Sequence, residues 1–211
     1  CTSITTFSEN RSAMSARIEF KEVVISDFAA EGKCVYKSDE GVVFVEGNVA
    51  PGDVVDLEVI GRKKKFKVAV VKKIHSYSNL RSQPYCEHHE VCGGCRWQHI
   101  GYEHQLDFKR QQVVDHFERI GKISGVEVNP IIPSRTTDYY RNKLEFTFSN
   151  SRWLTNEQIR SGEAFSRNAL GFHVPKRFDR IFSVTHCHLQ PEPSNTIRNR
   201  LYELTEKIEA S

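Results

Sequence analysis

The centre of the sequence reads Pro84-Tyr85-Cys86-Glu87-His88-His89-Glu90-Val91-Cys92-Gly93-Gly94-Cys95. This stretch spaces three cysteines as C-x5-C-x2-C, and Cys187 follows far downstream. Thiols gathered this closely, in a chain with no sign of export, predict a metal centre rather than disulfides. Structural zinc sites usually take their ligands from two short pairs, whereas three ligands from one loop and a distant fourth are common in iron–sulfur sites. The spacing therefore favours an iron–sulfur site.

The composition is that of an ordinary globular chain. Its 211 residues are 38% hydrophobic and 27% charged, enough for one large domain or two small ones with a buried core. No apolar run approaches the roughly 20 residues of a membrane span, and no segment has the pattern of a secretory signal. We therefore expect a cytoplasmic protein with reduced thiols, no membrane partner and no obligate protein partner. Residues 1–16 are expected to be a leader or tag-like segment, and the only methionine, Met14, indicates either the native start or a fragment.

Basic residues are concentrated in one short segment. The net charge of +3 is too small to prove a nucleic-acid partner, but residues 61–73 contain no acidic side chain. The basic residues of this segment are Arg62, Lys63, Lys64, Lys65, Lys67, Lys72 and Lys73. Such a local excess can neutralise RNA phosphates and makes binding depend on salt. The alternative is a solvated edge strand, because lysine commonly guards a sheet edge against pairing.

The first part of the chain, residues 17–77, alternates short β-like runs with glycine- and proline-containing turns. Strands are predicted over residues 18–27, 34–36, 42–45, 54–60 and 66–74. Five short strands in about 60 residues indicate a small barrel of the OB type rather than a sandwich. Barrels of this type often bind nucleic acid on one face. Cys34 falls inside this barrel, away from the cysteine loop.

The second part, residues 78–211, carries the cysteine loop and mixes helices with strands. An amphipathic helix is predicted over residues 102–120, with Gly121 as its stop. Further strands are predicted over residues 126–132, 140–149, 169–174 and 181–184, with a polar excursion at 149–168 and a final helix over 195–209. The predicted fold class is therefore mainly β with α (α+β). An OB-like barrel is followed by an α/β central domain, which is expected to be incomplete.

Several segments, taken in order, resemble the RNA uracil-5-methyltransferase family. The segments that resemble its TRAM domain, an RNA-binding OB-like barrel, are Glu31-Gly32-Lys33-Cys34-Val35, Phe44-Val45 and Pro51-Gly52-Asp53-Val54-Val55. The loop from Cys86 through Cys95-Arg96-Trp97-Gln98-His99 is similar to the family's iron–sulfur region. Tyr140-Arg141-Asn142-Lys143 and Leu170-Gly171-Phe172-His173 are similar to strands of its central domain, and Cys187-His188-Leu189 matches the place of its distal cluster ligand. The combination of barrel and four cysteines is typical of the 23S ribosomal RNA branch.

This resemblance implies a structural [4Fe–4S] cluster held by Cys86, Cys92, Cys95 and Cys187. The alternative is zinc, with ligands drawn in part from His88, His89, His99, His186 and His188. The resemblance also implies that a C-terminal domain binds S-adenosylmethionine and supplies a cysteine nucleophile and a carboxylate base. No glycine-rich strand–turn–helix fingerprint occurs in this sequence. We therefore expect the N-terminal RNA-recognition portion of the enzyme, with no catalytic residue of its own.

The residues expected to contact RNA, with 23S ribosomal RNA as the expected partner, are Arg62, Lys63, Lys64, Lys65, Lys67, Arg81, Arg96, Arg141, Lys143, Phe172 and His173. The basic members would bind phosphates, and Phe172 and His173 would approach a splayed base, since RNA loops are read by stacking on aromatic rings. A core role is the alternative for both aromatic residues. Two other functions remain open: a stand-alone RNA-binding module with structural zinc, and a radical enzyme that cleaves S-adenosylmethionine. The second is weak, because such enzymes usually space their ligands as C-x3-C-x2-C.

Overall fold

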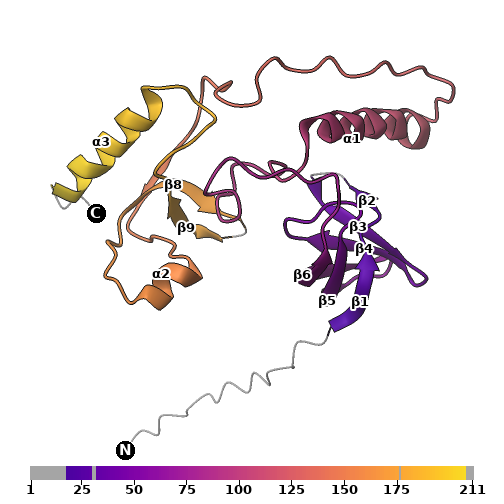
Figure 1. Cartoon of the computed structure of the whole chain (residues 1–211), viewed down its shortest axis with the longest axis horizontal. Helices are drawn as coiled ribbons and strands as arrows, with labels where there is room; N and C mark the ends of the chain where they lie inside the picture. The colour runs from indigo at the N-terminus through magenta and orange to yellow at the C-terminus, as the bar shows by residue number, and fades with distance from the viewer. Residues whose placement is uncertain (1–17, 30–31, 176, 208–211) are drawn as a thin grey trace, which may run out of the picture. The chain divides into compact units, whose positions relative to one another are not determined.

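The computed structural model describes residues 18–29, 32–175 and 177–207, and the chain divides into two compact units (Figure 1). The first unit contains the described residues up to Ala29 together with Lys33–Ser78, and the second contains Gly32 and the described residues from Asn79 onward. The expected leader, residues 1–16, and Glu31 lie outside the described residues. Within the described part, no helix is long and apolar enough to cross a membrane.

The first unit is a curled sheet of six strands (Figure 1). The strands are β1 (Ile18–Val24), β2 (Asp27–Phe28), β3 (Cys34–Ser38), β4 (Gly41–Glu46), β5 (Val54–Arg62) and β6 (Phe66–Ser76), in the order β1-β5-β6-β4-β3-β2. Only β4 and β6 pair in parallel. β1 and β2 occupy opposite edges of this order, yet only Ile25 and Ser26 separate them in the chain. Two residues cannot span a flat sheet of this width, so the sheet curls into a half-barrel until its edges approach each other.

Side chains that alternate along the strands fill the interior of the half-barrel. The buried residues of this core are Ile25, Cys34, Val43, Val45, Val49, Val55, Leu57 and Ala69. The spacing of Val43 from Val45, and of Val55 from Leu57, is the period of two that places both members on the same face of a strand. Burial of each such aliphatic side chain contributes about 1.5–3 kcal/mol. Cys34 is a core residue, and its Sγ lies 3.1 Å from the Val49 carbonyl oxygen.

The turn before β5 shows how the sequence determines local structure. The Asp53 amide donates to the Ala50 carbonyl oxygen at 3.1 Å, and Gly52 has φ +88°. This geometry is that of a type II turn, which requires a positive φ at its third residue and favours proline at its second, here Pro51. Asp53 is fully buried, but its carboxylate accepts bonds from the Ala50 and Ser78 amides at 2.7 and 2.8 Å. Both oxygens are therefore satisfied, as a buried charge requires.

The second unit combines short helices with a three-stranded antiparallel sheet (Figure 1). Its elements are α1 (Tyr102–Asp115), the π-helical turn η2 (His116–Ile120), β7 (Thr147–Ser149), α2 (Asn156–Ser161), β8 (Ala169–Val174), β9 (Arg177–Ser183) and α3 (Ser194–Lys207), and its strand order is β7-β8-β9. Gly171 pairs with Ser183 at the centre of this sheet. A Cβ atom at Gly171 would lie 1.9 Å from the Phe182 carbonyl oxygen, so only glycine permits this approach of two backbones.

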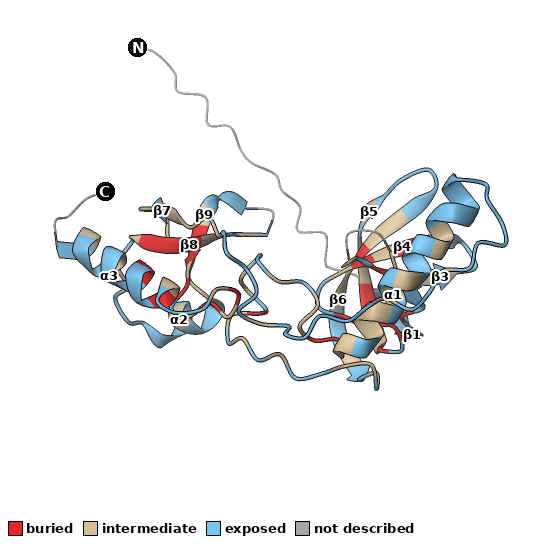
Figure 2. Cartoon of the chain, turned by 90° about the horizontal axis from the view of Figure 1, so that it is seen from above, coloured by how far each residue is buried: buried red, intermediate tan, exposed pale blue. Residues whose placement is uncertain are grey.

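The structure confirms most of the elements predicted for the second unit and corrects others. The strand predicted over residues 126–132 is wrong, because the segment is irregular and Pro130 and Pro133 lack amide donors. The strand predicted over 140–149 is reduced to β7, because the Arg141 amide donates to the Leu189 carbonyl oxygen at 2.8 Å, outside any regular strand. The polar excursion contains α2, which Thr155 starts with a capping box. α1 has no buried residue, so its predicted apolar stripe is not part of the core (Figure 2).

One hydrophobic cluster of the second unit is built around candidate metal ligands. Its buried residues are Phe182, Val184, Cys187 and Leu189, and the partly buried residues packed against them are Val91, Cys92, Cys95, Leu144, Phe146, Trp153, Phe172 and Val174. Ile100, Ala169, Leu170 and Ile181 are buried elsewhere in this unit. Cysteine, which serves in the half-barrel as a small apolar side chain, recurs here in a group. In this cluster, the thiol-bearing residues and the apolar side chains therefore pack against one another.

Candidate metal centre and RNA surface

The four predicted ligands line one pocket: Cys86, Cys92 and Cys95 come from the loop before α1, and Cys187 from the segment between β9 and α3. Burial raises the pKa of the Cys92 thiol to about 11 and raises the pKa values of Cys86 and Cys95 as well. The charge of Cys187 is a further, smaller cause of the raised pKa of each of the three loop thiols. Burial disfavours the ionised form of each thiol, yet four thiols line the same pocket. A cation bound among them would stabilise the thiolates, so the pocket is suited to a metal.

Two amide side chains hold the ligand-bearing backbone in place. Gln98 Oε1 accepts a bond from the Cys86 amide at 3.2 Å, and the hydrogen bond of the Gln98 side chain to Cys95 counteracts the rise in the pKa of that thiol. Asn195, which is 3% exposed, accepts from the Cys187 amide at 2.8 Å and donates to the Cys187 carbonyl oxygen at 3.2 Å. Sequence reasoning missed both roles. Gln98 at least stands within the recognisable loop motif, whereas nothing in the local sequence marks Asn195.

A buried cation lies beside the distal ligand. Arg198 is 4% exposed, and its guanidinium donates to the Val184 and Thr185 carbonyl oxygens at 3.2 and 2.8 Å and lies 4.9 Å from the centre of the Phe146 ring. Burial lowers the pKa of Arg198, and the negative charge of Cys187 acts in the opposite direction. Arg198 therefore places positive charge near the thiol cluster. No local sequence pattern distinguishes Arg198 from the other arginines of α3.

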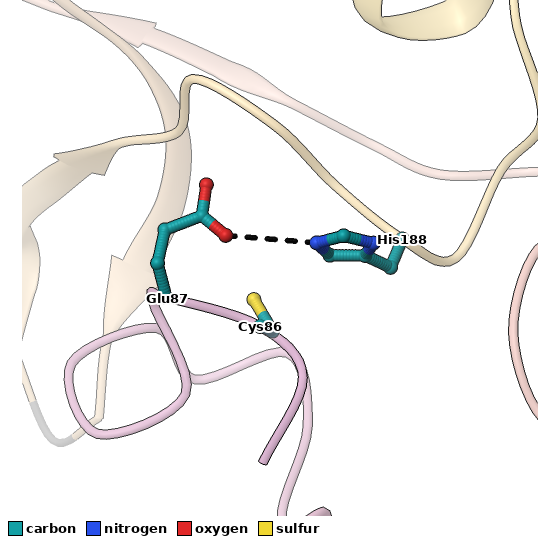
Figure 3. Close-up of side chains that lie close together, drawn as sticks. All are labelled: Cys86, Glu87 and His188. Atoms are coloured by element: carbon teal, nitrogen blue, oxygen red, sulfur yellow. Dashed lines mark ion pairs between the residues drawn. The ribbon is translucent and has the colours of Figure 1, made fainter.

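A second, more compact set of ligand atoms shares Cys86. The ligand atoms of Cys86, Glu87 and His188 lie within 4.8 Å of one another, and His188 Nε2 is 3.5 Å from Glu87 Oε2 (Figure 3). Within the described residues this is the only such group, so no three cysteine sulfurs approach one another that closely. A tetrahedral zinc ion with sulfurs at about 2.3 Å would bring those sulfurs within about 4 Å of one another. A four-iron cluster separates them further, because each thiolate binds a different iron.

The pocket can be tested against both metals. Four thiols, with Phe172, Val184 and Leu189 among the apolar walls, form the donor set and the dry surroundings of an iron–sulfur cluster. The space between the side chains is only about 20 Å³. A single ion at Cys86, Glu87 and His188 would need little rearrangement, whereas a cluster would displace the lining side chains outward. The donor chemistry thus fits a cluster, and the volume fits a single ion.

In the first unit, carboxylates divide the basic segment into paired and unpaired residues. Arg62 forms an ion pair with Glu19, and Lys67 Nζ lies 2.7 Å from Glu19 and 2.6 Å from Glu40. The hydrogen bond to Glu19 is the main cause of a raised pKa at Lys67. Within residues 18–29, 32–175 and 177–207, the exposed side chains without an ion pair at the turn between β5 and β6 are Lys63, Lys64 and Lys65. This turn, which we call the lysine turn, offers three unpaired cations that can face a phosphate backbone.

The predicted RNA residues of the second unit fall into different environments. Arg96 and Arg141 are exposed, Arg81 is half-buried, and Lys143 is exposed and lies 2.9 Å from Glu145. Arg141 is close enough to Cys95 to lower the pKa of that thiol. Arg141 and Lys143 lie in an irregular segment, which corrects the prediction of a strand over residues 140–149.

The two aromatic residues predicted to contact RNA, Phe172 and His173, lie in different environments. Phe172 packs against Phe146, with ring centres 4.8 Å apart, and lines the thiol pocket, which favours its alternative core role, while its contact with RNA stays a prediction. His173 is exposed, and its ring centre lies 6.5 Å from that of Phe178. Phe178 is 87% exposed and was missed from the sequence, because an isolated aromatic residue in a strand is indistinguishable from a core residue.

Comparison with known proteins supports an RNA methyltransferase family for the chain. No family model matches it. It is 48% identical over 172 residues to a protein of Bacteroides thetaiotaomicron named as an uncharacterized RNA methyltransferase, and 46% identical over 178 residues to one so named from Porphyromonas gingivalis. These matches cover 81% and 82% of the chain, and the chain spans only 38% of each relative.

A solved structure gives the same indication. The chain is similar, with a TM-score of 0.55 and 26% identity, to the crystal structure of Pyrococcus abyssi tRNA (uracil-54, C5)-methyltransferase in complex with S-adenosyl-L-homocysteine. The similarity covers 89% of the chain and 37% of that protein. Both comparisons thus cover most of this chain and less than two fifths of each longer protein.

Proposed function

We propose that this chain is the RNA-recognition portion of an S-adenosylmethionine-dependent RNA (uracil-5-)-methyltransferase. Its first unit would be a TRAM-like barrel of the OB type, and its second would hold a structural [4Fe–4S] cluster through Cys86, Cys92, Cys95 and Cys187. The observation that carries the proposal is the meeting of these four thiols in one pocket, in a chain whose relatives are named RNA methyltransferases. S-adenosylmethionine would be bound by a part of the enzyme that this chain does not contain.

The proposed role of the cluster is architectural. When bound, it would link the cysteine loop to the segment after β9 through metal–sulfur bonds. Because the buried apolar cluster there is small and includes Cys187 itself, metal binding would contribute a large share of the folding free energy. Gln98, Asn195 and Arg198 would hold the ligand-bearing backbone and balance its charge. Transfer of a methyl group from S-adenosylmethionine to a nucleophilic carbon needs no electrons, so no redox role is required.

RNA would contact both units. The lysine turn supplies unpaired positive charge, Arg141 lies close enough to Cys95 to lower the pKa of that thiol, and Arg96 is exposed next to it in the chain. His173 and Phe178 are exposed rings on which an unstacked base can rest. We propose 23S ribosomal RNA as the substrate, on the resemblance of the barrel and four cysteines. The name of the Pyrococcus neighbour makes tRNA the second candidate.

A specific observation favours one alternative, a stand-alone RNA-binding module with structural zinc. The preformed group of Cys86, Glu87 and His188 offers the nitrogen, oxygen and sulfur ligands that zinc accepts. The two proposals exclude each other at this site, since Cys86 cannot complete both ligand sets.

Anaerobic purification of the 211-residue chain distinguishes the two metals. The proposal predicts a brown protein with broad absorbance near 400 nm and about four irons per chain. It also predicts that Cys92→Ser and Cys187→Ser lose the iron, whereas Glu87→Gln retains it. A colourless protein with one zinc, which Glu87→Gln releases and Cys187→Ser keeps, would establish the alternative.

The RNA interface is tested by charge reversal with a matched control. Lys63→Glu with Lys65→Glu removes two unpaired charges from the lysine turn, and Lys21→Glu with Lys37→Glu makes the same charge change at exposed positions of β1 and β3. Binding of fragments of 23S ribosomal RNA and of tRNA is measured against salt concentration. The first pair should weaken binding and reduce the salt slope by about 0.7–0.9 per lost phosphate contact, and the control pair should change it less. Equal effects of the two pairs would remove the lysine turn from the interface.

A further inference from the structure

Two buried histidines near the thiol pocket are not among the proposed cluster ligands. His89 and His99 are 5% and 4% exposed, and His89 Nε2 lies 3.2 Å from His99 Nδ1. His89 also lines the same pocket as the four cysteines. Its remaining ring nitrogen, Nδ1, is buried and has no hydrogen-bond partner within the described part of the chain. A buried polar atom without a partner costs about 1–3 kcal/mol, so such an atom on a residue that lines a pocket of candidate ligands is a reason to look for a bound group there.

The chemistry of the pocket determines which form of His89 is favoured. Thiolate and sulfide sulfurs accept hydrogen bonds and cannot donate them, so a nitrogen that faces them is stabilised when it carries the proton. With the proton on Nδ1, the Nε2 atom of neutral His89 is an acceptor, and His99 Nδ1 can donate to it. The close contact between the two rings is therefore compatible with a donor aimed into the pocket.

We propose that His89 is a positioning residue for the cluster, which donates a hydrogen bond from Nδ1 to one of its sulfur atoms while His99 fixes the orientation of the ring. This inference rests on the proposed function, because it requires an iron–sulfur group at the four cysteines. Hydrogen bonds to cluster sulfurs stabilise the more negatively charged, reduced state and so raise the reduction potential. His89 would therefore set the potential of the cluster and its resistance to air, although methyl transfer does not use the potential.

Substitution of His89 by asparagine or by glutamine tests its two ring nitrogens one at a time. In His89→Asn the side-chain amide nitrogen falls near the position of Nδ1, so the donor toward the pocket is kept and the bond to His99 is lost. In His89→Gln the amide reaches the position of Nε2, so the bond to His99 is kept and the donor is lost. His89→Leu removes both. His116→Leu, at an exposed position of η2 outside the pocket, is the control.

The experiment uses the full 211-residue chain, reconstituted anaerobically with ferrous iron and sulfide. Iron content, the midpoint potential and the half-life of the 400 nm absorbance in air are measured for each variant. His89→Gln and His89→Leu should shift the ratio of reduced to oxidised cluster about tenfold toward oxidised at a given potential, which is a decrease of about 59 mV for one electron. They should also bleach faster in air, whereas His89→Asn and His116→Leu should stay close to the original protein.

The comparison of asparagine with glutamine decides the result even if the leucine variant fails to fold. Equal potentials in these two variants, or a normal potential in His89→Gln with a lowered one in His89→Asn, would overturn the proposed donor. A chain that takes up no iron before any substitution would instead refute the cluster itself. The failure of this inference and the failure of the proposed function are thus distinguishable.

Discussion

The two units of this chain bury their interiors by different means. The half-barrel encloses aliphatic side chains from strands that pair around a curled sheet, and Cys34 packs among them as a small apolar residue. The second unit has a three-stranded sheet and a buried cluster that includes Cys187, with Cys92 and Cys95 packed against it. The first unit is therefore expected to fold on apolar burial alone. The second is expected to depend on what its thiols bind.

The largest expected effect on stability and metal content comes from replacing the Cys187 sulfur by oxygen, and the same replacement at Cys34 is its control. Cys187→Ser should abolish metal binding and unfold the second unit, because a metal that joins distant segments supplies much of its folding free energy. Both tryptophans of the chain, Trp97 and Trp153, lie in that unit, so tryptophan fluorescence reports it selectively. Urea titrations followed by fluorescence and by far-ultraviolet circular dichroism should separate into two transitions.

Cys34→Ser is the control, because it should affect the half-barrel and leave the metal site of the second unit intact. It places a hydroxyl in the apolar core of the half-barrel and should lower the stability of that unit by about 1–3 kcal/mol, with metal content unchanged. Loss of metal in Cys34→Ser, or retention of the fluorescence transition in Cys187→Ser, would contradict the division of roles.

Gly171→Ala should destabilise the second unit next most strongly. The new Cβ would overlap the Phe182 carbonyl oxygen, so β8 and β9 must separate, at a cost of about 1–3 kcal/mol or more. Gly61→Ala in β5 is the matched control, since its Cβ would lie 3.7 Å from Val68 in ordinary contact. Thermal unfolding should show a lower midpoint for Gly171→Ala when followed by fluorescence, and little change for Gly61→Ala when followed by far-ultraviolet circular dichroism, which also reports the half-barrel. Equal midpoints would mean that the sheet tolerates the separation.

Leu57→Ala should destabilise the half-barrel by about 2–5 kcal/mol, as expected for a fully buried leucine. The iron content and the tryptophan transition should remain those of the original chain. A variant that loses iron together with barrel stability would show that the two interiors are energetically coupled.

The smallest expected effect is a pH dependence of the half-barrel. The bond from the Glu22 amide at 2.9 Å is the first cause, and His75 a further one, of a lowered pKa at Asp56. Because the pKa is lower in the folded state, the ionised carboxylate stabilises the unit above its ordinary pKa of 3.8, and this contribution is lost as the pH falls through the lowered value. Asp56→Asn should flatten the fall of the urea midpoint between about pH 5 and pH 2. An unchanged pH profile would remove Asp56 from the acid response.

The sequence predicted a small barrel of five strands, and the structure has a six-stranded half-barrel whose longer strands lie near the predicted ranges, because the information that specifies them is local. Alternation of Val43 with Val45 and the Pro51-Gly52 turn each specify structure within a few residues. In the second unit, the segment at residues 140–149 alternates just as clearly, yet its backbone bonds to residues 188–189 and most of it is not a strand. Cysteine spacing identified the pocket, but Asn195 and Arg198 act through backbone groups near Cys187, which no local pattern reveals. Ion pairs with Glu19 and Glu40 equally removed Arg62 and Lys67 from the unpaired charge of the basic segment.

The most direct test is hydrogen exchange of the full chain before and after chelation of its metal, resolved by peptide mass spectrometry. The account predicts that peptides over residues 84–99 and 169–189 lose protection when the metal is removed. Peptides from β5 and β6 should keep the protection they had before chelation. Unchanged protection in the second unit, or equal loss in both units, would contradict the claim that only the second unit is held together through its thiols.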